Sequence, residues 1–403
     1  MPTGRTTGVL DGLRIIELSA FVAVPLGGLT LAQMGADVIR VEPLGGGLDY
    51  RRWPLTESGE SLYWAGLNKG KRSIAVGMRS EEGRRLIRQL VTAPGPDNGI
   101  VITNVSPTWL DYETLSETRS DLIMVTLSGS PDGSTAVDYT INAATGYPVV
   151  TGDPDIMVNH VLPAWDVVAG ATVATAVLAA ERHRSRTGAG GHVQLSLADI
   201  AFSTVGHLGH VGEVVINGDD RQAHGNFVFG SFGKDFETAD GRVMVTAVTV
   251  RQWKALVAAT ETGPAIKELE GQLGVDFRNE GMRFEARQAI TNTFASWFAK
   301  RSVAEVGSAL DDHHACWGPF RTFRSLVEDD PRLHPSTNPL WTAVDQPGIG
   351  QYPMPGTPLT FSSVPRTPPV AAPSLGAHTS EILSEILGIQ AEELVTLREA
   401  NII

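Results

Sequence analysis

The 403-residue sequence is short of cysteine, of positive charge and of long apolar runs. Its one cysteine, Cys316, excludes an intramolecular disulfide, so we expect a reducing, cytoplasmic compartment. Asp and Glu outnumber Lys and Arg by 45 to 32, and the formal charge of −13 argues against nucleic acid or an anionic membrane surface as a partner. We expect no signal peptide. The most apolar stretch, residues 167–180, is shorter than the roughly 20 residues that span a bilayer, so we expect no membrane partner.

The first half of the chain alternates between short apolar stretches of strand length and helical patterns. Strands are predicted over residues 13–18, 37–42, 73–76, 99–103, 122–127 and 192–197. Helices are predicted over residues 26–34, 80–92 and about 166–186, with another from residue 198. Strands that alternate with helices form βαβ units, so we predict an α/β fold with a mostly parallel sheet.

The composition changes near Asn217. Residues 218–233 are rich in Gly, Asp and Phe and are typical of a loop or hinge. Residues 236–310 indicate a smaller α+β segment, with helices near 251–260 and 283–299. Residues 331–373 contain many prolines and have little regular pattern, whereas residues 380–401 are helical again.

Asp166 is the first candidate for chemistry. It stands directly before an apolar helix, where backbone N–H groups and the helix dipole favour an ionised carboxylate. An ionised, partly desolvated carboxylate can attack a thioester and form a covalent intermediate. The same position also suits a helix cap without chemistry, and the local pattern by itself favours that interpretation.

Other patterns carry weaker signals. The basic loop at residues 68–73 could hold phosphates through Lys69, Lys71 and Arg72, or it could be an ordinary solvated loop. Residues 225–230 have the glycine spacing that opens a P-loop, but Ser231 stands where lysine is required, so a nucleotide hydrolase is not expected.

A metal site is also not expected. His313 and His314 are adjacent and point in different directions, and no second ligand cluster matches them. Four further histidines could be acid–base groups or ordinary surface and core residues: His160, His207, His210 and His224.

Several stretches together resemble the family III CoA-transferases. They occur in the family's order over nearly the whole chain: LDGLRIIEL at 10–18, GADVIRVEP at 35–43, KRSI at 71–74, VDY at 137–139, Asp166 before its helix, residues 188–197, and TADG at 238–241. The resemblance implies a large nucleotide-fold domain built from both ends of the chain and a smaller inserted α+β domain. It therefore implies a large CoA-binding domain at 1–216, the small domain with its linker at 217–330, and a return to the large domain at 331–403. It also implies an interlocked homodimer.

The resemblance implies that Asp166 is the nucleophile, that an acyl-CoA is the substrate, and that no cofactor is needed beyond the CoA of the substrate. Departures from the family pattern narrow the activity. Val137 and Val250 stand where the family's racemases carry His and Glu, so proton abstraction beside the thioester is disfavoured. Val22 replaces a glutamine of the formyl-CoA transferases, and Tyr112 replaces a frequent arginine, which indicates a different acyl pocket and partly different CoA contacts.

Longer stretches resemble family members that move CoA within one diacid: residues 19–33, 47–54, 64–74, 159–166, 234–238 and 346–350. They imply intramolecular CoA transfer between the two carboxyl groups of mesaconate, from 2-methylfumaryl-CoA to 3-methylfumaryl-CoA, through an aspartyl-CoA intermediate. An intermolecular transferase, for example from succinyl-CoA to mesaconate, is the near alternative. A CoA-binding protein without chemistry is the distant alternative.

Beyond Asp166, the predicted site residues fall into two groups. The first is expected to bind CoA: Arg40, Lys71, Arg72 and Asn104. The second is expected to contact the acyl group: Arg51, Arg52, Phe21 and Gly230. The guanidinium fork of Arg51 or Arg52 matches a carboxylate, although an exposed loop pair is an equally good interpretation. Residues 225–233 are the candidate lid.

Overall fold

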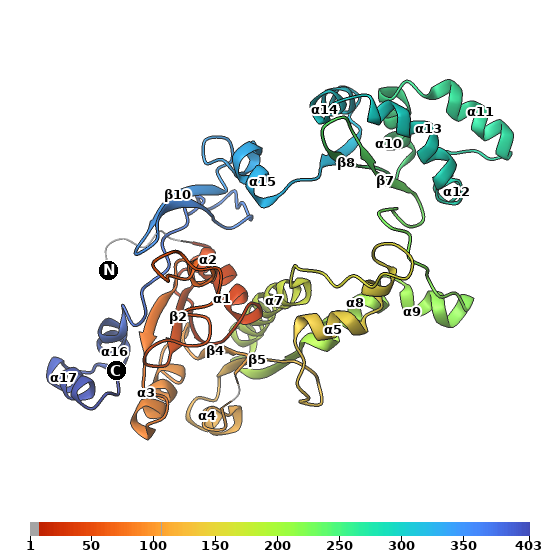
Figure 1. Ribbon diagram of the computed structural model, residues 1–403. Coiled ribbons are helices and arrows are strands. Elements are labelled where there is room, and N and C mark those ends of the chain that lie inside the picture. The colour runs from red at the N-terminus through yellow and green to blue at the C-terminus, as the bar shows by residue number, and fades with distance from the viewer. Residues whose placement is uncertain (1–7, 106) are drawn as a thin grey trace. The chain divides into compact units, whose positions relative to one another are not determined.

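The computed structural model describes residues 8–105 and 107–403 and divides into two compact units, which are described separately (Figure 1). The larger unit runs to Thr145 and also includes His160–Ile216 and Pro331–Ile403. The smaller unit consists of Gly146–Asn159 and Asn217–Asp330. Residues 146–159, which the sequence pattern did not separate from the large domain, thus belong to the smaller unit.

A six-stranded sheet forms the centre of the larger unit, in the order β3-β2-β1-β4-β5-β6. Its strands are β1 (Arg14–Leu18), β2 (Asp37–Glu42), β3 (Arg72–Ala75), β4 (Ile100–Thr103), β5 (Ile123–Ser128) and β6 (Gly191–Ser196). Every pairing between neighbouring strands is parallel. The predicted α/β class and parallel sheet are therefore confirmed.

The strand order reverses beside β1, because β2 lies on one side of β1 and β4 on the other. Loops that leave the carboxyl ends of such neighbouring strands separate, and ligands of open α/β sheets bind at this point. Here the loops are joined by Asn104, which follows β4. Its amide oxygen accepts the Ala20 N–H at 2.8 Å, and its Nδ2 donates to the Ala20 carbonyl at 2.8 Å.

Helices cover both faces of the sheet in the larger unit (Figure 1). The helices of this unit are α1 (Ala23–Gln33), α2 (Leu62–Leu67), α3 (Glu81–Val91), α4 (Tyr112–Thr118), α5 (Asp138–Ala144), α7 (Ala164–Thr187), α8 (Leu197–His207), α9 (His210–Gly212), α16 (Thr379–Leu387) and α17 (Ala391–Glu399), of which α9 lies away from the sheet. The C-terminal helices pack into the same hydrophobic cluster as α3, through residues such as Leu383 and Leu397. A π-helical turn at Glu213–Asn217 follows α9, and a 3₁₀ turn at Pro331–Leu333 follows the smaller unit.

Helices α1 and α7 pack closely because both carry glycine where they meet. A Cβ on Gly27 would stand 2.8 Å from Val173 Cγ1, and one on Gly170 would stand 2.9 Å from the Ala23 carbonyl oxygen. Neither distance leaves room for a side chain. The contact fixes the start of α1 beside the start of α7, where Asp166 lies.

Helix α7 is, by length and composition alone, long and apolar enough to cross a membrane. The core helix of a soluble protein passes the same test. The buried residues of α7, which include Ala169, Val173 and Val177, face α1 and β5. Only 33% of this apolar window is buried inside the structure, so α7 is buried along one face and is not the fully buried helix that the sequence predicted.

The smaller unit is an antiparallel sheet with helices. Its strands are β7 (Phe232–Glu237), β8 (Arg242–Ala247) and β9 (Cys316–Pro319). Its helices are α6 (Tyr147–Val150), α10 (Val250–Ala259), α11 (Gly263–Leu273), α12 (Glu280–Glu285), α13 (Arg287–Ala299), α14 (Val303–Asp312) and α15 (Phe323–Asp329). The core is aromatic, with the ring of Phe232 5.8 Å from Trp253 and 5.7 Å from Phe294.

The structure differs from the sequence-based elements in three places. Residues 331–373, expected to lack regular structure, contain the hairpin of β10 (Trp341–Gln346) and β11 (Gly350–Pro355). The helix predicted over residues 283–299 is two helices that meet at Ala286. Helix α7 begins two residues before Asp166 instead of after it.

Candidate active site

Asp166 lies in the first turn of α7 and does not cap the helix. The N-cap position is Pro163, whose side chain accepts no hydrogen bond. Asp138, at the start of α5, supplies the missing acceptor. Its Oδ2 accepts the backbone N–H of Trp165 at 2.7 Å and that of Asp166 at 3.1 Å. The helix-cap interpretation of Asp166 is therefore wrong, and its carboxylate is available for another task.

The environment of Asp166 makes its carboxylate unusually basic. Burial raises its pKa to about 6, the negative charge of Asp138 adds to the rise, and Arg52 partly opposes it. At neutral pH such a group is still mostly ionised. Its raised basicity makes the ionised form a stronger nucleophile than an ordinary carboxylate. The position thus suits covalent catalysis.

Arg52 and Tyr63 are the polar groups that share this electrostatic environment. The Arg52 guanidinium carbon lies 5.1 Å from the ring centre of Phe21 and 5.3 Å from that of Tyr63. The Tyr63 hydroxyl is buried and has no hydrogen-bond partner among the described residues. Burial first, and then the charge of Asp49, raise the pKa of Tyr63 to about 12, so the hydroxyl stays protonated. It is a donor without an acceptor.

The loop after β1 holds Phe21 in an uncommon backbone conformation. Phe21 has a φ of +66°, in the left-handed region that non-glycine residues rarely occupy. Its N–H donates to both carboxylate oxygens of Asp49, each at 2.9 Å. Its side chain is 40% exposed and supports Arg52. Strained backbone that the surroundings enforce is typical of functional sites.

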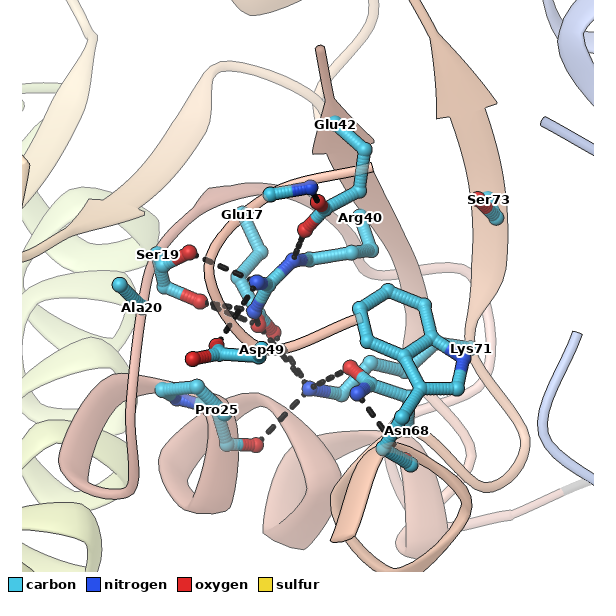
Figure 2. Close-up of polar contacts among 12 residues, drawn as sticks. Glu17, Ser19, Ala20, Pro25, Arg40, Glu42, Asp49, Asn68, Lys71 and Ser73 are labelled. Carbon is cyan, nitrogen blue, oxygen red and sulfur yellow. Dashed lines mark hydrogen bonds and ion pairs between the residues drawn. The ribbon is translucent and has the colours of Figure 1, made fainter. Parts of the chain in front are cut away.

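A buried ionic network, which we call the Arg40 network, lies behind this loop (Figure 2). The Arg40 guanidinium pairs with Glu17 at 2.8 Å, with Glu42 at 2.5 Å and with Asp49 at 3.3 Å. Burial alone disfavours its charge, but these carboxylates outweigh that effect and raise the pKa of Arg40. Lys71, whose pKa burial lowers to about 8, pairs with Glu17 at 2.9 Å.

The Arg40 network also binds the backbone of the loop. Arg40 donates to the Ser19 hydroxyl and, at 2.7 Å, to the Ser19 carbonyl. Lys71 donates to the Pro25 carbonyl in α1 at 2.8 Å. The network therefore shapes the segment that carries Phe21.

The predicted CoA-binding residues are engaged within the fold. The side chains of Arg40 and Lys71 are 1% and 0% exposed. Arg72 pairs with Asp37 at 2.6 Å and with Glu385 at 2.7 Å. Asn104 holds the loop at Ala20. These positions favour a structural role for Arg40 and Lys71 over phosphate contacts.

The predicted acyl-group residues lie in different units. Arg52 and Phe21 lie near Asp166 in the larger unit, and Arg51 is exposed next to Arg52. Gly230 belongs to the smaller unit and has a φ of +72° with open space around it. In the candidate lid around Gly230, the ring centre of Phe229 lies 3.5 Å from the Arg221 guanidinium carbon. The roles of Gly230 and the lid stay predictions.

Sequence reasoning missed Tyr63 and Asp49. Tyr63 lies in the short helix α2, and nothing in its neighbourhood marked it as polar machinery. Asp49 lies within a stretch that carried the resemblance, but no motif gave it a role. Asp138 was present in the stretch 137–139, yet its contact with α7 joins residues 27 and 28 positions apart.

The larger unit combines a parallel α/β sheet with a partly buried, unusually basic carboxylate at Asp166, and comparison with known proteins gives the class of protein. The model of CoA-transferase family III matches residues 10–379, so the chain belongs to this family. It is 51% identical over 402 residues to the 2-methylfumaryl-CoA isomerase of Chloroflexus aurantiacus, covering 98% of each chain.

Two further relatives place the chain within the family. A succinyl-CoA:mesaconate CoA-transferase of Haloarcula hispanica is 29% identical over 399 residues, covering 94% of this chain and 96% of that one. A solved CAIB/BAIF family protein from Brucella suis matches with a TM-score of 0.76 at 25% identity, covering 94% of this chain and 99% of that one.

Proposed function

We propose that this protein is an intramolecular CoA-transferase that converts 2-methylfumaryl-CoA into 3-methylfumaryl-CoA. The observation that carries the proposal is the 51% identity to a 2-methylfumaryl-CoA isomerase over 98% of both chains. The basic, partly buried carboxylate of Asp166 supports the same chemistry. We therefore prefer intramolecular CoA transfer to the two alternatives, an intermolecular CoA-transferase and a CoA-binding protein without chemistry.

The reaction begins at Asp166. Its carboxylate attacks the thioester carbonyl, the carbon–sulfur bond breaks, and CoA leaves as a thiolate with the bonding electrons. The product of this step is a mixed anhydride between Asp166 and mesaconate. The thiolate then attacks the aspartyl carbonyl and releases mesaconate, which leaves an aspartyl-CoA thioester on the enzyme.

Retention of mesaconate distinguishes an isomerase from an ordinary transferase. The second carboxylate of the same molecule attacks the aspartyl-CoA thioester, the carbon–sulfur bond breaks, and CoA leaves as a thiolate from the new mixed anhydride. The thiolate then attacks the mesaconyl carbonyl of this anhydride, which gives 3-methylfumaryl-CoA and frees the Asp166 carboxylate. Keeping the diacid bound makes this attack effectively unimolecular, which can be worth about 7–11 kcal/mol of barrier. Exclusion of water protects the anhydride during the exchange.

Arg52 and Tyr63 are the groups that we assign to the diacid. The guanidinium, held over the rings of Phe21 and Tyr63, offers two parallel donors to a carboxylate. The buried Tyr63 hydroxyl offers a third donor that the described residues leave without an acceptor. A diacid has a carboxylate at each end, so one end can be held while the other reacts.

An intermolecular transferase is the second candidate function, because a succinyl-CoA:mesaconate CoA-transferase is also related. The two are separated by incubating the enzyme with 2-methylfumaryl-CoA and an excess of ¹³C-labelled mesaconate. We expect 3-methylfumaryl-CoA without label, as measured by mass spectrometry. Labelled product would assign intermolecular transfer instead, and the absence of either product would remove this substrate.

The assembly and the location belong to the same proposal. Membership of the family supports an acyl-CoA substrate and an interlocked homodimer. Light scattering tests the dimer, for which the expected mass is twice the 43.0 kDa of one chain. We also propose a cytoplasmic location. The single cysteine, Cys316, is free, and a chain without disulfides is typical of a reducing compartment.

A further inference from the structure

Helix α7 carries the proposed nucleophile but has no cap of its own. The first backbone N–H groups of a helix lack intrahelical partners and need an acceptor from elsewhere. Pro163, at the N-cap position, supplies none from its side chain. The acceptor comes from Asp138, which lies 28 residues before Asp166 in the chain and is 2% exposed.

We propose that Asp138 is a positioning residue for Asp166, and that His160 holds Asp138 in the orientation this requires. The inference rests on the proposed role of Asp166 as nucleophile and goes beyond it. It assigns functions to two residues that do not themselves react with the substrate.

The two carboxylate oxygens of Asp138 have different partners: one accepts hydrogen bonds from α7, and the other faces His160. Oδ2 accepts the N–H groups of Trp165 and Asp166, which fixes the main chain from which the nucleophile projects. Oδ1 lies 2.9 Å from His160 Nε2, which is placed to donate to it. With both oxygens engaged, the carboxylate cannot rotate away from α7 without losing a hydrogen bond.

A second contact joins the same two helices. The indole N–H of Trp165 donates to the Asn142 side-chain oxygen at 3.0 Å, one turn along α5 from Asp138. Trp165 is 6% exposed, so the joint between α5 and α7 is largely shielded from water. Helix α5 thus holds the residue before Asp166 through both its backbone and its side chain.

The charge of Asp138 gives this joint a chemical consequence that a neutral cap would lack. The charged and titratable groups around Asp166 are Arg52 from the loop after β2, Tyr63 from α2, Asp138 with its neighbour Tyr139 from α5, and His160 from the loop before α7. Asp138 is the carboxylate of this set whose charge raises the pKa of Asp166, in addition to burial. Asp138 therefore holds the main chain at Asp166 in place and also keeps the Asp166 carboxylate basic.

The direct test measures the titration of Asp166 without relying on turnover. Unfolding free energies of the wild type and of Asp166→Asn are compared between pH 4 and pH 8. Because the folded pKa of Asp166 is raised to about 6, the wild type gains stability relative to the variant as pH falls through this value. The same comparison is then made between Asp138→Asn and the double variant that also carries Asp166→Asn. There we expect the midpoint of the Asp166 titration to fall by about one pH unit, because the neighbouring negative charge is gone.

Activity supplies the second readout. Asp138→Asn keeps an oxygen for the two N–H groups, so we expect kcat/KM to acquire an acidic limb at lower pH while the melting temperature changes little. Asp138→Ala removes the acceptor, and we expect kcat to fall by about 100-fold with a smaller change in KM, since misplacement of a reacting group has effects of this size. His160→Gln is expected to recover part of the activity that His160→Ala loses.

Ser80→Ala is the matched control. Ser80 caps α3 by accepting the Gly83 N–H at 3.0 Å, so its loss tests the effect of removing a helix cap elsewhere. We expect a lower melting temperature and an unchanged pH profile.

An unshifted Asp166 titration in the Asp138→Asn background would overturn the inference, as would a loss of activity in Asp138→Ala that only follows loss of folded protein. The proposed function can fail separately, because the titration midpoint shifts or does not shift whether or not 2-methylfumaryl-CoA is a substrate.

Discussion

Two groups of buried carboxylates in the larger unit differ in how their charges are matched. In the Arg40 network, three carboxylates surround two cations, and each cation makes short contacts with them. Around Asp166, the charge of a second carboxylate, Asp138, raises the pKa, and the cation that opposes this rise is the exposed Arg52. Matched charges hold the loop that carries Phe21, whereas the poorly matched pair leaves a basic carboxylate free to react. Perturbed groups of the second kind are typical of active sites.

The largest expected effect comes from removing the reactive member of the poorly matched pair. Asp166→Asn should lower kcat by at least about 10⁴-fold, as loss of a covalent nucleophile does. The folded state should be as stable as the wild type or more stable, because the like charge beside Asp138 is gone. Product is measured by chromatography of the two CoA esters.

Asp199→Asn is the matched control for that change. Asp199 occupies the corresponding position in the first turn of α8 and is exposed. It should retain wild-type activity. Substantial isomerase activity in Asp166→Asn would instead show that the nucleophile lies elsewhere.

Breaking the matched network should act on stability. Arg40→Met leaves Glu17, Glu42 and Asp49 buried with Lys71 as their nearby cation, so the free energy of unfolding should fall by about 3–5 kcal/mol. Denaturant titration measures the change. Arg85→Met, which removes an exposed helical pair with Glu82, should change it by no more than about 0.5 kcal/mol. Equal effects of the two substitutions would mean that the network does not stabilise the loop.

Tyr63→Phe separates binding from folding. The hydroxyl has no partner among the described residues, so its removal should leave stability unchanged. If it donates to the diacid, kcat/KM should fall by about 10- to 100-fold, the usual size of a hydrogen bond to a charged group. Steady-state kinetics and thermal melting measure the two quantities. Tyr352→Phe in β11 is the control, and a loss of stability without loss of activity would contradict the assignment.

The smallest expected effect is on pH dependence. Reaction needs ionised Asp166, so kcat/KM should fall as pH drops through about 6. Stability moves the other way: the raised folded pKa favours the protonated, folded form, so the Asp166 carboxyl costs stability above pH 6 and this cost disappears toward pH 4. We expect about 1 kcal/mol, since a two-unit shift of about 3 kcal/mol is reduced by solvent screening. An acidic limb near pH 4 would mean that Asp138 and burial have no effect.

The strands show why part of the fold was predictable. The predicted limits 37–42 match β2, and all six residues of β2 are buried. A strand that is covered on both faces of the sheet carries few exposed positions, so it stands out in the sequence as a compact stretch rich in apolar residues. The hairpin of β10 and β11 was not predicted, because Trp341–Gln346 mixes buried and exposed positions and lies among prolines.

The site shows the same limit at the level of single residues. Asp166 could be selected because it lies beside an apolar helix and within a family pattern. Arg40 and Lys71 were assigned to phosphates because their charge was visible, whereas their partners were not: Glu17 is 23 residues from one and 54 from the other. A cation's role depends on what it meets in space.

The sequence by itself determined the α/β class, the mostly parallel sheet, the resemblance to the family and the choice of Asp166 as a candidate, since these follow from residue type, spacing and order along the chain. Only the tertiary structure decided three other properties: the order of the strands within the sheet, the capping of α7 by Asp138, and the burial of Arg40 and Lys71. It also left the Tyr63 hydroxyl without a partner among the described residues. These properties depend on distances between segments and on exclusion of water, which exist only once the chain is folded.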